Sequence, residues 1–126
     1  MAFYLEKKKT KSTPYMLIDQ EKNYMKLEGD SFPEFAVEFY HEANDWLSGY
    51  LETDFKSFTF DCALKYINSS STKILFDILA FMDESSGEGN KITVNCYIES
   101  GDYMMRELYE DIRDEMENLQ INFVES

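Results

Sequence analysis

Residues 58–73, FTFDCALKYINSSSTK, decide the fold. Large apolar and polar side chains alternate from residue 58 to 67, which predicts a β-strand with one buried and one wet face. Amphipathic spacing over residues 73–82 predicts a helix. Between the two, Asn68 is followed by four hydroxyl side chains in a row, whereas a helix start needs one capping group. The strand-to-helix junction therefore carries more hydroxyls than capping requires.

Working outward, the same alternation recurs over residues 92–99 and predicts a second long strand. Two short β-type runs, 15–19 and 24–28, are separated by four polar residues and predict a hairpin. Gly29-Asp30 is expected to break the second of these strands. Residues 121–124 are expected to add a final edge strand.

Three helical stripes connect these strands. Ser31 and Glu34 have capping-box spacing and predict the start of the first helix, with Ser31 as the cap. Its apolar face is expected to consist of Phe35, Phe39, Ala43, Trp46, Leu47 and Tyr50. The second stripe ends at Gly87 and Gly89. The third runs over Met105, Leu108, Tyr109, Ile112 and Met116.

The resulting order is β-β-α-β-α-β-α-(β), which indicates an α/β protein. Right-handed crossovers of this length connect parallel neighbours, and alternation leaves each strand one apolar face, so every helix must pack on that face. We therefore predict a two-layer sandwich with a mixed, mostly parallel sheet and helices on one face. We expect residues 1–126 to form a single domain, with residues 1–13 as a flexible or loosely docked lead-in.

The chain is acidic: its 126 residues carry a net charge of −13, which argues against nucleic acid or an anionic membrane as a partner. No apolar run is long enough for membrane insertion. Acidic residues concentrate on the last helix: Glu107, Glu110, Asp111, Asp114, Glu115 and Glu117. They form either a solvated face or a surface that steers a basic partner. A cytoplasmic location is expected, because no signal peptide or transmembrane run is seen and the two cysteines alternate with core residues.

Residues suited to catalysis are scarce. The single histidine, His41, lies on the polar side of the first helix, and Cys62 and Cys96 are expected to be buried. No CxxC pair or glycine-rich phosphate motif occurs. We therefore predict that this chain is not an enzyme and that it has no metal site and no cofactor.

The hydroxyl run itself has two interpretations. It is either a redundant cap in a polar loop or a place for a phosphate, which the amides and dipole of a helix N-terminus favour.

Several segments together resemble one family. The pattern from about Ser12 to the C-terminus is similar to that of the SiaC family of bacterial regulatory phosphoproteins, through Gly29-Asp30-Ser31-Phe32-Pro33-Glu34, Phe39-Tyr40, Trp46-Leu47, Tyr66-Ile67-Asn68-Ser69-Ser70-Ser71-Thr72-Lys73 and Val94-Asn95-Cys96-Tyr97. Cys96 departs from the family pattern, where relatives often carry tryptophan.

The resemblance implies a STAS-like fold, similar to that of anti-sigma-factor antagonists, and a partner switch in cyclic di-GMP signalling and biofilm control. In such a switch a serine/threonine kinase phosphorylates a hydroxyl at the start of the helix, and a PP2C-type, metal-dependent phosphatase removes the phosphate. The unmodified protein binds and activates a diguanylate cyclase (GGDEF) target.

The resemblance also implies which residues act. The family's phosphoacceptor is the first hydroxyl after the asparagine, usually threonine, and here it is Ser69, with Ser70, Ser71 and Thr72 as alternatives. Asn68, Ser69, Ser70 and Lys73 are expected to bind partners. Ser71 or Ser70 is expected to cap the helix and leave Ser69 free. The alternative function is a STAS-like domain that binds a small ligand, such as a nucleotide or lipid, on its open sheet face.

Overall fold

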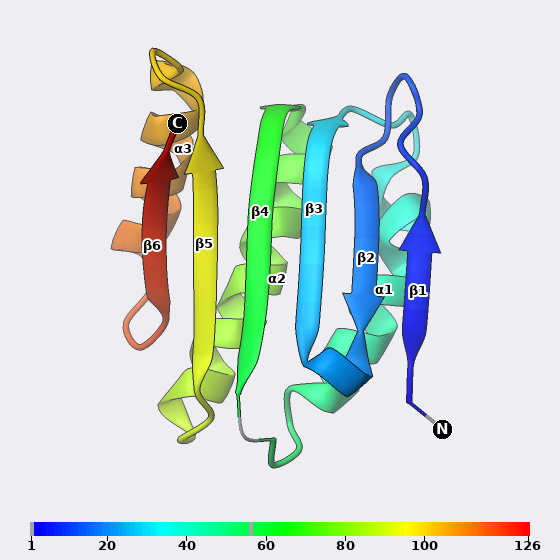
Figure 1. Ribbon diagram of the computed structural model, residues 1–126, viewed down its shortest axis with the longest axis vertical. Coiled ribbons are helices and arrows are strands. Elements are labelled where there is room, and N and C mark those ends of the chain that lie inside the picture. Colours follow the sequence, from blue (N-terminus) through cyan, green and yellow to red (C-terminus); the bar gives the residue numbers. More distant parts are fainter. Residues whose placement is uncertain (1, 56) are drawn as a thin grey trace.

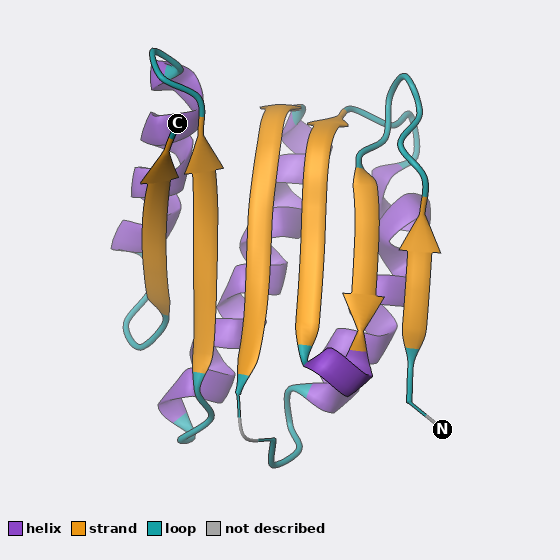
Figure 2. Ribbon diagram, viewed as in Figure 1, coloured by secondary structure: helices purple, strands orange, loops and turns teal. Residues whose placement is uncertain are grey.

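The computed structural model describes residues 2–55 and 57–126, which form one six-stranded sheet with three helices behind it (Figures 1 and 2). The strands are β1 (Tyr4–Lys7), β2 (Tyr15–Asp19), β3 (Tyr24–Ser31), β4 (Phe58–Ile67), β5 (Ile92–Ile98) and β6 (Gln120–Glu125). The helices are α1 (Ala36–Tyr50), α2 (Ser69–Gly87) and α3 (Tyr103–Asp114). A 3₁₀ turn, η1 (Gln20–Lys22), joins β2 to β3.

The strands lie side by side in chain order. β1, β2 and β3 are antiparallel neighbours, and β3 to β6 are parallel. Each parallel crossover contains one helix, and all three helices cover the same face (Figure 1), as right-handed crossovers in one direction require. The predicted fold class, a two-layer α/β sandwich with a mixed, mostly parallel sheet and helices on one face, is confirmed.

The core lies between the sheet and the helices. Alternate residues of β4 and β5 are fully buried there, including Cys62 and Cys96, which are paired in register as free thiols. From the helices, Leu47, Ile78 and Tyr109 are buried against them. The period-two alternation of these strands therefore marked the buried face correctly.

The opposite face of the sheet is polar and is organised around Asp61 on β4. One carboxylate oxygen of Asp61 accepts a hydrogen bond from the hydroxyl of Tyr24 at 2.7 Å, and the other accepts one from Asn95 at 2.9 Å. Asn122 donates in turn to the side-chain oxygen of Asn95 at 3.1 Å. Partial burial and the bond to Asp61 raise the pKa of Tyr24. This ladder ties β3, β4, β5 and β6 together on the side without helices.

The expectation of a flexible or loosely docked lead-in over residues 1–13 is wrong for residues 4–7, which form strand β1. Lys7 donates to the carbonyl oxygen of Phe39 at 2.7 Å, and its ammonium lies 4.6 Å from the centre of the Phe39 ring. Phe3 stacks on Trp46 with ring centroids 5.0 Å apart. Long-range packing against α1, which local composition does not reveal, orders this segment.

The expected capping box is also wrong. Ser31 is the buried last residue of β3, and α1 begins only at Ala36, with Phe35 at its cap position and no side-chain cap bond. Nor does Gly29-Asp30 end the strand, because β3 continues through a register shift between these two residues. Gly29 adopts a φ of 112°, which glycine tolerates without a Cβ penalty.

The remaining strand and helix predictions agree with the structure. The hairpin, the two long strands and the final edge strand are confirmed. The second and third apolar stripes face the core, whereas in the first stripe Phe35 is exposed. Among the described residues, no helix is long and apolar enough to span a membrane.

The buried thiols allow a test. Burial raises the pKa of Cys62 to about 11 and also raises that of Cys96. We expect a thiol reagent at pH 8 to modify them only at the rate of unfolding, because the thiolate is the reactive form. Above pH 9 the unfolded chain binds fewer protons than the folded chain, so these thiols should lower stability as pH rises. Rapid modification of the native protein, followed by mass spectrometry, would contradict this burial.

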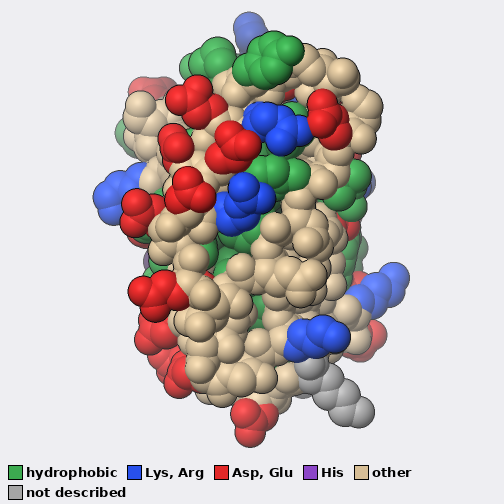
Figure 3. Space-filling view, turned by 90° about the vertical axis from the view of Figure 1, so that its left-hand side faces the viewer, with side chains coloured by type: hydrophobic (Ala, Val, Ile, Leu, Met, Phe, Trp, Pro, Cys, Tyr) green, Lys and Arg blue, Asp and Glu red, His purple; other side chains and the backbone are tan. Residues whose placement is uncertain are grey.

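Two kinds of carboxylate on the helix side of the sheet make a second test. Figure 3 views the molecule from the side of β6 and α3, and acidic side chains gather along one side of this view. Asp83 on α2 accepts the backbone N–H groups of Glu117, Asn118 and Leu119, at 3.1, 2.7 and 2.8 Å. We expect Asp83→Ala to cost about 2 kcal/mol of unfolding free energy, since these bonds go to a charged group. The matched double change Glu110→Lys and Asp114→Lys should stay within about 0.5 kcal/mol. Urea denaturation measures both, and equal losses would show that the α3 carboxylates also have structural partners.

Candidate functional site at the start of helix α2

The hydroxyl run lies at the carboxyl edge of the parallel strands, where β4 ends and α2 begins (Figure 1). The backbone N–H of Asn68 donates to the carbonyl of Ser31 at 3.0 Å, and Ile67 pairs with Ser31 in the sheet. The ends of β3 and β4 therefore hold the start of α2 in place.

Asn68 caps α2. Its side-chain oxygen accepts the backbone N–H of Ser71 at 2.9 Å, which is the usual N-cap geometry. The expectation that Ser71 or Ser70 caps the helix is wrong, because the cap lies one residue before the first hydroxyl. Thr72 donates its side-chain hydroxyl to the carbonyl of Asn68 at 2.8 Å.

Ser71 is buried beneath this turn. Its hydroxyl accepts a hydrogen bond from Ser31 at 2.9 Å, and Ser31 shares a second bond of 2.6 Å with the hydroxyl of Tyr40 on α1. All three side chains are buried, and burial raises the pKa of Tyr40 to about 12. This cluster, Ser31–Tyr40–Ser71, joins β3, α1 and α2, and sequence analysis missed it because its members lie up to 40 residues apart.

Ser69 and Ser70 differ from the other two hydroxyls in being exposed. No acidic residue occurs in residues 69–72, and the first turn of a helix favours negative charge. Lys73 is exposed one turn later and pairs with Asp77 at 3.6 Å. Of the expected partner-binding residues, Ser69, Ser70 and Lys73 thus reach solvent, whereas Asn68 is partly buried in its capping role.

Beside Ser70 lies a shallow, largely apolar hollow of about 580 Å³. We call it the α1 hollow, and it is lined by Ser70 together with Glu34, Phe35, Ala36, Val37, Glu38 and His41 from the start of α1. Phe35 was expected in the core but contributes here instead. Val37 lies off the predicted apolar stripe, and that was the one local signal that it would be exposed.

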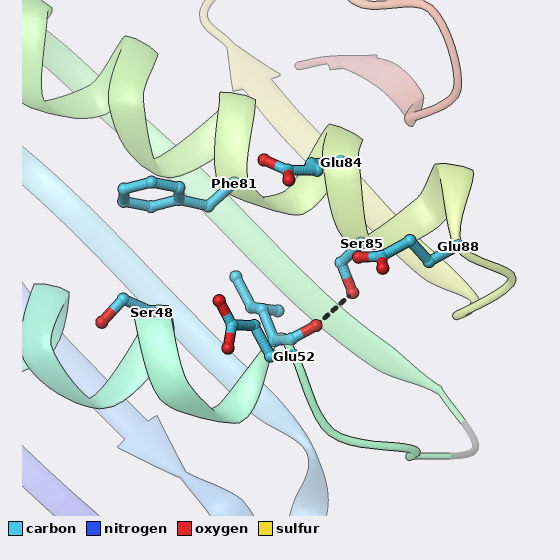
Figure 4. A pocket seen from close by; sticks show the side chains of 7 residues that line it. Ser48, Glu52, Phe81, Glu84, Ser85 and Glu88 are labelled. Atoms are coloured by element: carbon cyan, nitrogen blue, oxygen red, sulfur yellow. Dashed lines mark hydrogen bonds between the residues drawn. The ribbon is translucent and has the colours of Figure 1, made fainter.

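A second groove lies between α1 and α2 at their other ends (Figure 4). Glu52, Glu84 and Glu88 line it, and the buried Ser85 hydroxyl donates to the carbonyl of Leu51 at 2.7 Å. Ser85 in this groove lies about 24 Å from Ser69 along α2, at 1.5 Å per residue. Over residues 2–55 and 57–126, no cluster of three or more His, Cys, Asp or Glu side chains is arranged to hold a metal ion.

Comparison with known proteins assigns this chain to a family. The model of the SiaC family regulatory phosphoprotein matches residues 7–126, and the chain belongs to this family. A curated relative, an uncharacterized protein of Pseudomonas aeruginosa (strain UCBPP-PA14), is 28% identical over 106 residues, which is 84% of each chain.

Two solved structures share the fold along nearly the whole chain. SiaC of Pseudomonas aeruginosa matches with a TM-score of 0.89 and 25% identity, covering 98% of this chain and 99% of that one. The second is SiaC in the crystal structure of the diguanylate cyclase SiaD with its activator SiaC, from the same organism. It gives a TM-score of 0.91 at 25% identity, with 97% and 99% covered.

The buried cluster leads to a prediction about stability. We expect Ser31→Ala to lower the unfolding free energy by about 1–3 kcal/mol, because it leaves the buried hydroxyls of Tyr40 and Ser71 without their shared partner. The matched change Ser70→Ala, at an exposed hydroxyl in the same region, should stay within about 0.5 kcal/mol. Urea titrations of both variants measure the difference, and a neutral Ser31→Ala would show that the cluster does not brace the site.

Proposed function

We propose that this chain is a phosphorylation-gated partner-switch regulator without catalysis of its own. In its unphosphorylated form it binds and activates a diguanylate cyclase, and a serine/threonine kinase switches it off by phosphorylating Ser69. A PP2C-type phosphatase restores the active form. We expect it to act in the cytoplasm, where a kinase has access to ATP.

The proposal rests on a difference in accessibility among the four hydroxyls of residues 69–72. Ser71 is buried in the Ser31–Tyr40–Ser71 cluster, and Thr72 donates to the Asn68 carbonyl. Ser69 and Ser70 are the exposed pair. A kinase must reach the hydroxyl that it modifies, so the exposed pair supplies the candidates. Between these two, Ser69 is preferred because the family resemblance implies that the first hydroxyl after the asparagine is the phosphoacceptor.

A phosphate at Ser69 is compatible with the fold. It would enter the first turn of α2, where the helix dipole favours an anion, and would leave the Asn68 cap and the buried cluster in place. Its charge of about −1.5 to −2 would bring a hydration shell into a surface that must be desolvated when a partner binds. Phosphorylation is therefore expected to block binding without unfolding the protein.

The comparisons support the choice of target. A family of regulatory phosphoproteins accounts for residues 7–126, and one structural neighbour is crystallised with the diguanylate cyclase that it activates. The exposure of the first hydroxyl after Asn68 is consistent with a switch at this position. Ligand binding on the open sheet face stays an untested alternative.

Substitution of Ser69 tests the switch. We expect Ser69→Ala to bind and activate the cognate cyclase whether or not the kinase and ATP are present, whereas Ser69→Asp should bind at least about tenfold more weakly. Both variants should keep wild-type thermal stability. Calorimetric titration and cyclic di-GMP production measure these effects.

Mass spectrometry after incubation with the kinase checks the position. Modification of Ser70 with Ser69 untouched would move the switch by one residue. Modification of Ser71 or Thr72 would require the start of α2 to open. The absence of phosphate anywhere in the run would overturn the mechanism.

A further inference from the structure

The α1 hollow exposes apolar side chains that the fold does not use. Phe35 is 66% exposed and Val37 is 73% exposed, although α1 buries Ala36, Tyr40, Ala43 and Leu47 on its other side. Nothing in the core depends on these two side chains. Their exposure leaves apolar surface in water, which is unfavourable unless a partner covers it.

Acidic side chains border this apolar surface. Glu34 and Glu38 line the same hollow as Phe35 and Val37, in a chain whose net charge is −13. The surface that would complement it has a bulky apolar side chain in the middle and basic side chains beside it. Ser70, which follows the proposed phosphoacceptor, also lines the hollow.

From these features we infer that the α1 hollow is the docking site for the target protein. Its occupant is a segment of the target with a bulky apolar side chain flanked by lysine or arginine. The apolar side chain contacts Phe35 and Val37, and the basic side chains pair with Glu34 and Glu38. This inference rests on the proposed function and adds to it the surface and the chemistry of the partner.

The position of the hollow explains how a phosphate could act on binding. Ser70 lines the hollow and Ser69 is its neighbour at the start of α2, so a dianion there would lie at the rim. A strongly hydrated group at the rim opposes the removal of water from the apolar surface. The acidic groove between the far ends of α1 and α2 (Figure 4) is about 24 Å from Ser69 along α2, at 1.5 Å per residue, which is too far for a phosphate at Ser69 to gate it.

The start of α3 offers a matched control. Tyr103 and Met104 are 78% and 81% exposed, so they are as accessible as Phe35 and Val37 but lie on another helix. The test compares two double variants. One carries Phe35→Ser and Val37→Ser, and the other carries Tyr103→Ser and Met104→Ser. Circular dichroism and thermal unfolding establish that each variant keeps the fold, since all four side chains are exposed.

Binding of the unphosphorylated full chain to the cognate diguanylate cyclase is then measured by biolayer interferometry. We expect the Phe35/Val37 variant to lose at least about tenfold in affinity, as buried interface anchors do, and the Tyr103/Met104 variant to lose less than about twofold. Wild-type affinity for the Phe35/Val37 variant would overturn the docking site and leave the proposed function standing. No binding by the wild-type chain would overturn both.

Salt dependence tests the charge of the partner. Affinity of the wild-type chain should fall as ionic strength rises, because exposed ion pairs are screened. A double variant with Glu34→Gln and Glu38→Gln should bind more weakly at low salt, and its affinity should depend less on ionic strength. The control double variant on α3, with Glu110→Gln and Asp114→Gln, should keep the wild-type salt dependence. A dependence that only the α3 variant removes would place the basic contact on α3 and overturn the pairing inferred here.

Discussion

The direction of the three parallel crossovers is the constraint on which the rest of this structure depends. β3, β4, β5 and β6 follow one another across the sheet, so each right-handed crossover places its helix on the same face. One face of the sheet is therefore buried and the other stays in water. On the open face, the Tyr24–Asp61–Asn95–Asn122 ladder links polar side chains of four neighbouring strands. The same winding brings the starts of α1, α2 and α3 to the carboxyl edge of the parallel strands (Figure 1).

At that edge, structure and regulation are divided between neighbouring residues. The buried hydroxyl of Ser31 bonds both Tyr40 and Ser71, and Asn68 caps α2. These contacts hold the first turn of the helix independently of Ser69 and Ser70, which face solvent. A site arranged in this way can gain and lose a phosphate while its scaffold stays the same. That separation is what a reversible switch needs, because a modification that unfolded the protein would act on every surface at once.

The regulatory role proposed here follows from the position of the switch more than from its chemistry. A phosphate changes charge and hydration within a few ångströms, so it acts on binding only if the docking surface is adjacent. The α1 hollow meets this condition because Ser70 is part of its wall. Its lining combines apolar and acidic side chains, so apolar contacts would supply affinity and charge would supply orientation when a partner binds.

Local sequence periodicity determined the secondary structure that could be predicted: the alternation of 58–67 and 92–99, the helical stripes, and with them the helices on one face. The hydroxyl run could likewise be placed at a helix start, because capping and strand endings are local properties. What required the tertiary structure was each residue's environment. Ser71 is buried and bonded to Ser31, which in turn bonds Tyr40. β1 is ordered because Lys7 and Phe3 pack on α1, and Phe35 is exposed at the cap position just before α1 begins. These contacts join residues far apart in the chain, and no local pattern records them.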